Sequence, residues 1–79
     1  MNIARVRWAC RRGMLELDVL LQPFVENFYQ EMSDEDKTVF IRLLECEDPE
    51  LFAWFMGHEV CPDTELARMI VKVRGRPAP

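Results

Sequence analysis

Glycine, cysteine and histidine are scarce in this sequence, and each shortage argues against a class of site. The three glycines, Gly13, Gly57 and Gly75, stand far apart, so no glycine-rich loop is present to cradle a phosphate group. The three cysteines are odd in number and widely spaced, so no disulfide framework is indicated. The single histidine, His58, lies three residues before Cys61, but without a Cys-x-x-Cys pair the sequence predicts no metal site.

Long apolar runs and an N-terminal leader are also missing. No stretch approaches the roughly 20 apolar residues that a membrane-spanning helix needs, so we expect no membrane insertion. The first residues include arginines rather than an apolar signal core, and patterned sequence begins almost at once. We therefore expect a cytoplasmic bacterial protein that is translated directly in its mature form.

No arrangement of residues typical of catalysis is visible. A nucleophilic enzyme needs an activated Ser, Cys or Thr beside a base, and only His58 and Cys61 lie near each other in sequence. The acidic segment 45–50 surrounds a helix start, where carboxylates are favoured for local reasons. A chain of 79 residues also has little core to spare for a deep cavity. We expect no enzymatic activity.

Apolar side chains recur at helical spacing along the sequence, and no strand candidate competes with this pattern. The short connections between the apolar stretches require neighbouring helices to double back. The sequence therefore predicts an all-α fold, a small bundle of about five helices in a single domain over residues 1–74. The remaining residues, 75–79, are expected to form a disordered tail.

Capping residues and helix breakers predict where the helices begin and end. The first helix is expected to end in a left-handed cap at Gly13. The second is expected to begin near Met14 and to kink or restart at Pro23, because proline removes a backbone hydrogen bond. Serine, aspartate and glycine signals mark the later boundaries, at Ser33, Asp48, Gly57 and Asp63.

The net charge of −4 hides a division along the chain. Residues 1–13 contain four arginines and no acid, residues 14–65 contain all 14 acids, and residues 66–79 are again basic. The basic ends either pair with the acidic middle or present a basic face to an acidic or phosphate-bearing partner. The sequence favours pairing within the molecule over a basic face.

The charges around Gly13 exceed what a helix end requires. A helix C-terminus explains one arginine near its last carbonyls, and the start of the next helix explains one acid. Two consecutive arginines, a second acid and a tryptophan one turn earlier suggest a protein–protein contact surface, because Trp and Arg are enriched at binding hot spots. The candidate partner-binding residues are Trp8, Arg11, Arg12, Gly13, Glu16 and Asp18.

The segment from Trp8 to Asp18 closely resembles the signature of the bacterial succinate dehydrogenase FAD assembly factors, also called flavinylation factors. Their Arg-Gly-x-x-Glu core matches Arg12, Gly13 and Glu16. The likeness continues in order through nearly the whole chain, including Pro23-Phe24, residues 40–46, residues 48–52, Trp54 and residues 63–66. The core motif alone has low specificity, but a match across all the predicted helices is specific.

The resemblance implies a non-catalytic five-helix assembly factor. Members of this family bind the flavoprotein subunit of succinate dehydrogenase, and in some bacteria that of fumarate reductase, and promote covalent attachment of FAD to a histidine of that subunit. By the family pattern, Arg12, Gly13 and Glu16 engage the partner near its flavin site, and Trp8, Arg11 and Asp18 extend that surface. We expect FAD to belong to the partner, because this sequence has no strand–glycine–helix unit for a pyrophosphate.

Two other functions stay open at this point. Members of the same family have been described as antitoxins that neutralise a membrane-associated toxin, which is again an interaction role. Nucleic-acid binding through the arginine-rich first helix and the basic tail is disfavoured by the acidic middle of the chain. We expect a monomer, since aromatic residues on apolar helix faces usually pack in the core.

Overall fold

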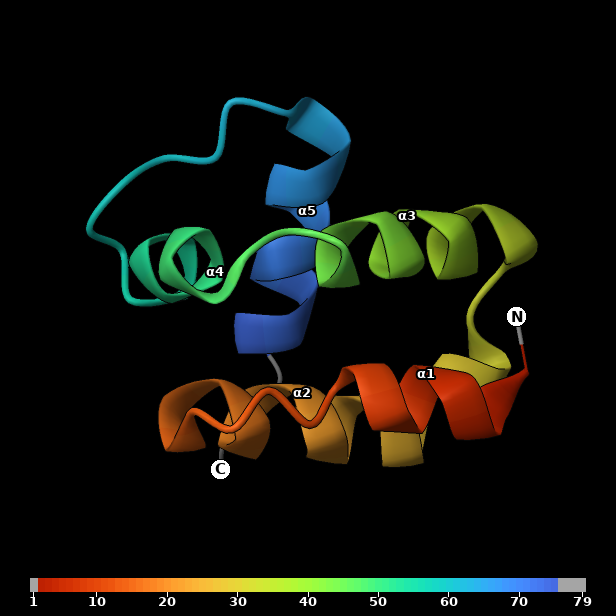
Figure 1. Ribbon diagram of the computed structural model, residues 1–79. Coiled ribbons are helices and arrows are strands. Elements are labelled where there is room, and N and C mark those ends of the chain that lie inside the picture. Colours follow the sequence, from red (N-terminus) through yellow and green to blue (C-terminus); the bar gives the residue numbers. More distant parts are fainter. Residues whose placement is uncertain (1, 76–79) are drawn as a thin grey trace.

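Helices make up most of the computed structural model, which describes residues 2–75 (Figure 1). Five α-helices and one short 3₁₀ helix follow one another along this part of the chain, which contains no strand. Their bounds are α1 (Ile3–Ala9), α2 (Leu15–Phe28), η1 (Tyr29–Glu31), α3 (Asp34–Leu44), α4 (Asp48–Phe55) and α5 (Thr64–Arg74). The predicted all-α fold is confirmed.

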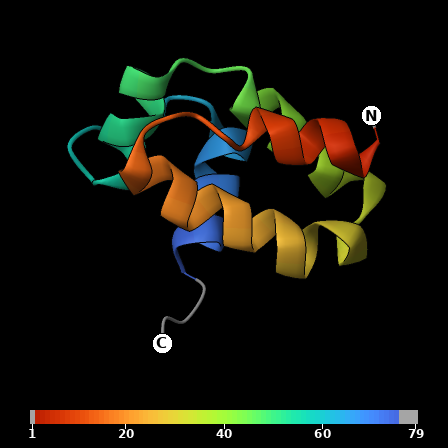
Figure 2. The ribbon, with the colours of Figure 1, turned by 60° about the horizontal axis from the view of Figure 1, so that its bottom comes forward.

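The helices are arranged as two layers with α5 running across them. Helices α1 and α2 lie side by side, and α3 and α4 lie on the other side of the molecule (Figure 1). Helix α5 packs against α3 most extensively and also contacts α2 and α4. The connection from α1 to α2 passes next to α4 (Figure 2).

One continuous apolar core holds these layers together. Every α-helix contributes to it, because each has apolar residues three and four positions apart on one face. Phe40 lies at its centre, with its ring centroid 5.4 Å from that of Phe24 and 5.9 Å from that of Tyr29. The fully buried side chains are Val6, Cys10, Leu17, Leu21, Val25, Phe40, Leu43, Leu51 and Phe55.

Local capping signals set several boundaries as predicted. The Ser33 hydroxyl accepts a hydrogen bond from the backbone N–H of Asp36 at 3.1 Å, and the Asp63 carboxylate accepts one from Leu66 at 3.0 Å. Gly57 follows α4 with a φ of +79°, as a left-handed cap requires. Helix α4 starts one residue earlier than expected, since Glu47 rather than Asp48 is its N-cap.

Two predicted boundaries are wrong. Helix α1 ends at Ala9, before Gly13, because residues 11–13 leave the helix to contact other parts of the molecule. Helix α2 does not restart at Pro23 but continues to Phe28. Pro23 and Val19, one turn earlier, are both exposed, so water can satisfy the carbonyl that proline leaves without a donor.

Two further expectations concern the tail and membranes, and one observed element, the 3₁₀ helix, was not expected. Residues 76–79 lie outside the described residues, and with them most of the predicted disordered tail. The turn at η1 has no counterpart among the sequence predictions. No described helix combines the length and the apolar character needed to cross a membrane.

Candidate functional site

The candidate site is the segment 10–18, here called the corner, which connects α1 to α2. It begins at Cys10, whose backbone N–H still bonds to Val6 and Arg7 and whose side chain is fully buried. Burial raises the pKa of the Cys10 thiol to about 12, so this cysteine is an inert packing residue rather than a nucleophile. The corner is therefore anchored in the core at its first residue.

Arg12 fixes the corner to the segment between α3 and α4. Its Nε donates to Asp48 Oδ1 at 2.7 Å, and Nη2 donates to the Cys46 carbonyl at 2.8 Å. Its Nη1 donates both to the Leu44 carbonyl at 2.8 Å and to the Ala9 carbonyl at 2.9 Å. The Arg12 side chain is only 15% exposed. A single guanidinium thus joins the end of α1 to the end of α3 and the start of α4.

Asp18 closes the corner from the other side. Its carboxylate accepts a hydrogen bond from the backbone N–H of Arg12 at 2.9 Å. Because Asp18 lies in the first turn of α2, its negative charge is also favoured by the helix dipole. Asp18 and Arg12 therefore act together to give residues 11–13 a fixed conformation.

Gly13 lies at the exposed point of the corner, with a φ of +80°. A side chain there is strained because L-residues seldom adopt positive φ. No atom of the chain lies within 4 Å of the place where a Cβ would sit, so packing within the molecule does not require the glycine. The space beside Gly13 is open to a partner.

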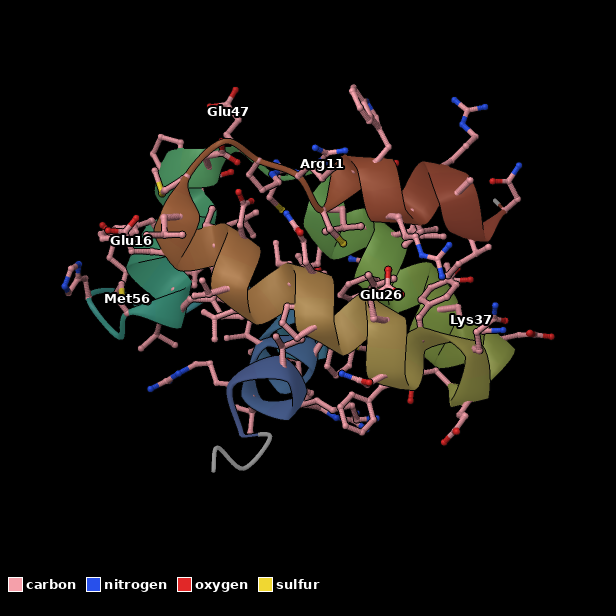
Figure 3. All side chains as sticks on the ribbon, turned by 90° about the horizontal axis from the view of Figure 1, so that it is seen from below. Arg11, Glu16, Glu26, Lys37, Glu47 and Met56 are labelled. Atoms are coloured by element: carbon pink, nitrogen blue, oxygen red, sulfur yellow. The ribbon has the colours of Figure 1, made fainter. Side chains whose placement is uncertain are left out.

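Three of the candidate residues present their side chains to solvent. Trp8 is 72% exposed, and the guanidinium carbon of Arg11 lies 5.6 Å from the centroid of its ring. Glu16 is exposed and has no hydrogen-bond or ion-pair partner among the described residues. Figure 3 shows Glu16 near the start of α2.

The six candidate residues thus separate into two groups. Arg12 and Asp18 hold the corner in shape, whereas Trp8, Arg11, Gly13 and Glu16 are exposed. The family pattern predicts that Arg12 engages a partner, but its guanidinium donates four hydrogen bonds within the chain. The structure favours a positioning role for Arg12.

Sequence reasoning missed Asp48 as part of the site. It was interpreted as a helix cap, although its carboxylate pairs with Arg12 across 36 positions of the sequence. No local signal in the sequence predicts a pair this distant. Leu15 and Val19 of α2 are also exposed, and no sequence prediction concerned them.

A metal centre is not formed by the described residues. They contain no group of three or more His, Cys, Asp or Glu side chains placed to hold a metal ion. Cys10, Cys46 and Cys61 are free thiols. Cys10 and Cys61 are buried, whereas Cys46 is half-buried.

These features define a class: a small all-α protein whose surface presents a rigid, charged glycine corner. The model of a family described as flavinator of succinate dehydrogenase matches residues 4–77. The FAD assembly factor SdhE of Shewanella oneidensis is 86% identical over all 79 residues, which cover 96% of that protein. The chain therefore belongs to the family of FAD assembly factors of succinate dehydrogenase.

More distant relatives agree with this assignment. The FAD assembly factor SdhE of Yersinia pseudotuberculosis is 52% identical over 95% of this chain and 85% of its own length. The solution structure of a UPF0350 protein, 49% identical in sequence, superposes with a TM-score of 0.75. That match covers 91% of this chain and 77% of the other. The family and the fold are thus supported independently.

Proposed function

We propose that this protein binds the flavoprotein subunit of succinate dehydrogenase through the corner and promotes covalent attachment of FAD to that subunit. The same binding surface suits the flavoprotein of fumarate reductase. The bond-forming chemistry belongs to the flavoprotein and its cofactor. The observation that carries the proposal is the combination of a rigid backbone around Gly13 and an exposed carboxylate, Glu16, without a partner among the described residues.

Rigidity supports this proposal energetically. A loop that is ordered before it binds does not lose conformational freedom in the complex. Four side-chain hydrogen bonds from Arg12 and one from its backbone N–H keep the corner ordered. Open space beside Gly13 allows the partner's backbone to approach closely, and Glu16 supplies a charge-assisted hydrogen bond.

The mechanism we propose is a shift of population in the partner. The factor binds one conformation of the flavoprotein in preference to others, and this raises the fraction of molecules in which the flavin and its histidine are aligned. Alignment of two reacting groups lowers the entropic part of the barrier. No catalytic group is required from the factor itself.

We propose that FAD is held by the partner rather than by this chain. The groove between α3 and α5 has a volume of about 910 Å³, and it is lined by the acids Glu35, Asp36 and Glu65 together with the bases Arg42, Arg68 and Lys72. Arg42 pairs with Glu65 and Lys72 pairs with Asp36, so most of these charges are used within the chain. The groove therefore offers no net positive charge to select the pyrophosphate of FAD.

Substitution of Glu16 tests the proposal. Apo flavoprotein and FAD are incubated with wild-type factor, Glu16→Gln or Glu31→Gln, and covalent flavin is read by in-gel fluorescence after denaturation. Glu31 is the control, because it is an exposed carboxylate at the opposite end of α2. We expect Glu16→Gln to lower the flavinylation rate about tenfold, as loss of one charged hydrogen bond predicts. Equal stimulation by both variants would contradict this role of Glu16.

A further inference from the structure

Two of the three cysteines lie where the end of α3 meets the start of α5. Cys46 follows α3 and donates from its thiol to the Arg42 carbonyl at 3.8 Å. Cys61 precedes α5 and donates from its thiol to the Asp63 carbonyl at 3.7 Å. The side chains of Arg42 and Asp63 form an ion pair, with 2.7 Å between Nη2 and Oδ2. The two thiols therefore border the same contact between α3 and α5.

The acidity of the Cys46 thiol also shows that Cys61 is near. Burial raises the pKa of Cys46 above its ordinary value, and the charges of Glu50 and Cys61 raise it further. Charge interactions weaken with distance, so a thiol has this effect only at short range. Cys10 is fully buried, and its pKa is shifted by burial and by charged residues rather than by another thiol. Cys46 and Cys61 therefore form a pair from which Cys10 is separate.

Residue 46 also takes part in the hydrogen bonds that hold the corner. The Cys46 carbonyl accepts a hydrogen bond from Arg12 Nη2 at 2.8 Å. Residues 45–47 make up the whole connection between α3 and α4, so this segment has little freedom to absorb a movement of Cys46. The conformation of Cys46 is thus coupled to the guanidinium that orders the corner.

We propose that Cys46 and Cys61 are a redox-sensitive pair, which a hydroperoxide oxidises to a disulfide bond that loosens the corner. The consequence for flavinylation rests on the function proposed above. The reduced protein, in which both cysteines are free thiols, is the active form of the factor. The disulfide form presents Gly13 and Glu16 on a corner that is no longer ordered before binding, so binding costs more conformational entropy.

The oxidation proceeds in two steps. The Cys46 sulfur attacks one oxygen of the hydroperoxide, the O–O bond breaks, and the leaving alkoxide takes the Cys46 proton, which gives a sulfenic acid and an alcohol. The Cys61 sulfur then attacks the Cys46 sulfur, the S–O bond breaks, and the departing oxygen leaves as water with the Cys61 proton. The two thiols lose two electrons in total, and the peroxide is reduced by the same two electrons.

Cys46 reacts first because it is half-buried, whereas Cys61 is only 7% exposed. The raised pKa of Cys46 keeps the thiolate fraction small at neutral pH, so the reaction is slow and follows sustained oxidation. Both thiols point at carbonyls of their own segments and must turn away before the sulfurs approach to about 2 Å. This movement of residue 46 disturbs its bond to Arg12.

The first test counts free thiols after oxidation. Reduced protein and protein treated with hydrogen peroxide are unfolded in iodoacetamide, and intact mass and peptide mapping identify the alkylated cysteines. We expect three alkylated cysteines in the reduced protein and only Cys10 in the oxidised protein, with a reducible link between Cys46 and Cys61. Cys61→Ala is the matched variant and is expected to form no link within the molecule. Oxidised wild type without a link between Cys46 and Cys61 overturns the inference.

Hydrogen exchange measures the corner without a partner. The backbone N–H of Arg12 donates to Asp18 at 2.9 Å, and we expect it to exchange about tenfold faster in the disulfide form. The control is the backbone N–H of Asp36, which donates to Ser33 at the far end of α3 and is expected to exchange at the same rate in both forms. An unchanged rate at Arg12 in the linked protein overturns the coupling to the corner.

The flavinylation assay separates this inference from the proposed function. After the peroxide is removed, oxidised wild type is expected to stimulate flavinylation of apo flavoprotein about tenfold less than reduced wild type, and dithiothreitol is expected to restore it. Cys61→Ala, with its fold checked by circular dichroism, is expected to stimulate equally before and after peroxide. If the disulfide forms without loss of stimulation, the inference fails and the proposed function stands. Reduced wild type that does not stimulate overturns the proposed function, whatever the thiol count.

Discussion

The Arg12 guanidinium donates its hydrogen bonds within the molecule, to three backbone carbonyls and one carboxylate. Helix α1 is short. The chain after it is ordered by hydrogen bonds from the Arg12 side chain to Leu44, Cys46 and Asp48 instead of by helical backbone bonds. Because the Arg12 side chain is only 15% exposed, its hydrogen bonds are shielded from water and contribute more to stability than surface ion pairs do.

Arg12→Gln is expected to destabilise the protein by about 2–3 kcal/mol, because it leaves half-buried carbonyls and the Asp48 carboxylate without a donor. The free energy of unfolding is measured by urea denaturation followed by circular dichroism. The control is Arg7→Gln, which breaks an ion pair whose two side chains are each 51% exposed and is expected to cost less than about 1 kcal/mol. Equal losses of unfolding free energy in the two variants would show that Arg12 stabilises the fold no more than an exposed ion pair does.

At this scale the sequence predicts which residues are exposed better than it predicts which contacts the others make. Trp8, Arg11, Gly13 and Glu16 were identified from residue type and local spacing, and all four are exposed. The contact between Arg12 and Asp48 depends on how α1 and α4 are placed relative to each other, which is a property of the packed core. Its two partners are 36 positions apart, beyond the range of any helical periodicity.

Local capping and tertiary or solvent contacts both determine where the helices of this protein begin and end. Ser33 and Asp63 cap α3 and α5 through bonds to residues three positions away, so they could be predicted from the sequence. The end of α1 lies before the predicted residue, and α2 shows no restart at Pro23. Tertiary hydrogen bonds of Arg12 account for the first difference, and solvent exposure of the freed carbonyl explains the second.

Capping by Asp63 makes the stability of α5 dependent on pH. The pKa of Asp63 is lowered because its carboxylate accepts the Leu66 N–H and lies against Arg42. A carboxyl with a lowered pKa in the folded state stabilises the fold above its unfolded pKa, and this contribution is lost as the pH falls through the folded value. We therefore expect the stabilising contribution of the Asp63 carboxylate to be lost below about pH 4.

We predict that Asp63→Asn flattens the acid side of the stability profile, since asparagine caps a helix equally well and does not titrate. Thermal unfolding between neutral pH and pH 2 measures the effect. Ser33→Ala is the matched control: it removes a cap from α3 and lowers stability by about 1 kcal/mol at every pH. An unchanged acid profile in Asp63→Asn would mean that other carboxylates control acid unfolding.

In the part of the chain that the structure describes, the exposed large apolar side chains are spread over several elements. Trp8 lies on α1, Leu15 and Val19 on α2, Met56 after α4, Val60 in the loop before α5, and Val71 on α5. A stable dimer buries roughly 800 Å² on each partner, usually with an apolar centre. No single element of the described chain offers such a centre.

We therefore predict a monomer of 9.4 kDa in solution. Sedimentation equilibrium over a wide range of protein concentration measures the mass directly. A concentration-dependent increase in mass would contradict the prediction, and its disappearance in Trp8→Ala would assign the contact to Trp8 on α1. The net charge of −4 adds a long-range repulsion between copies, which is strongest at low salt.

The link between Arg12 and the segment 44–48 has a consequence for genetics. A random screen for bacteria that fail to flavinylate their succinate dehydrogenase is expected to recover substitutions at Asp48 alongside those at Glu16. Asp48 is 31% exposed and lies on α4, outside the corner, so such alleles map apart from the others in the gene. Second-site suppressors of Asp48 alleles should accordingly arise near Arg12, because the two positions share one interaction.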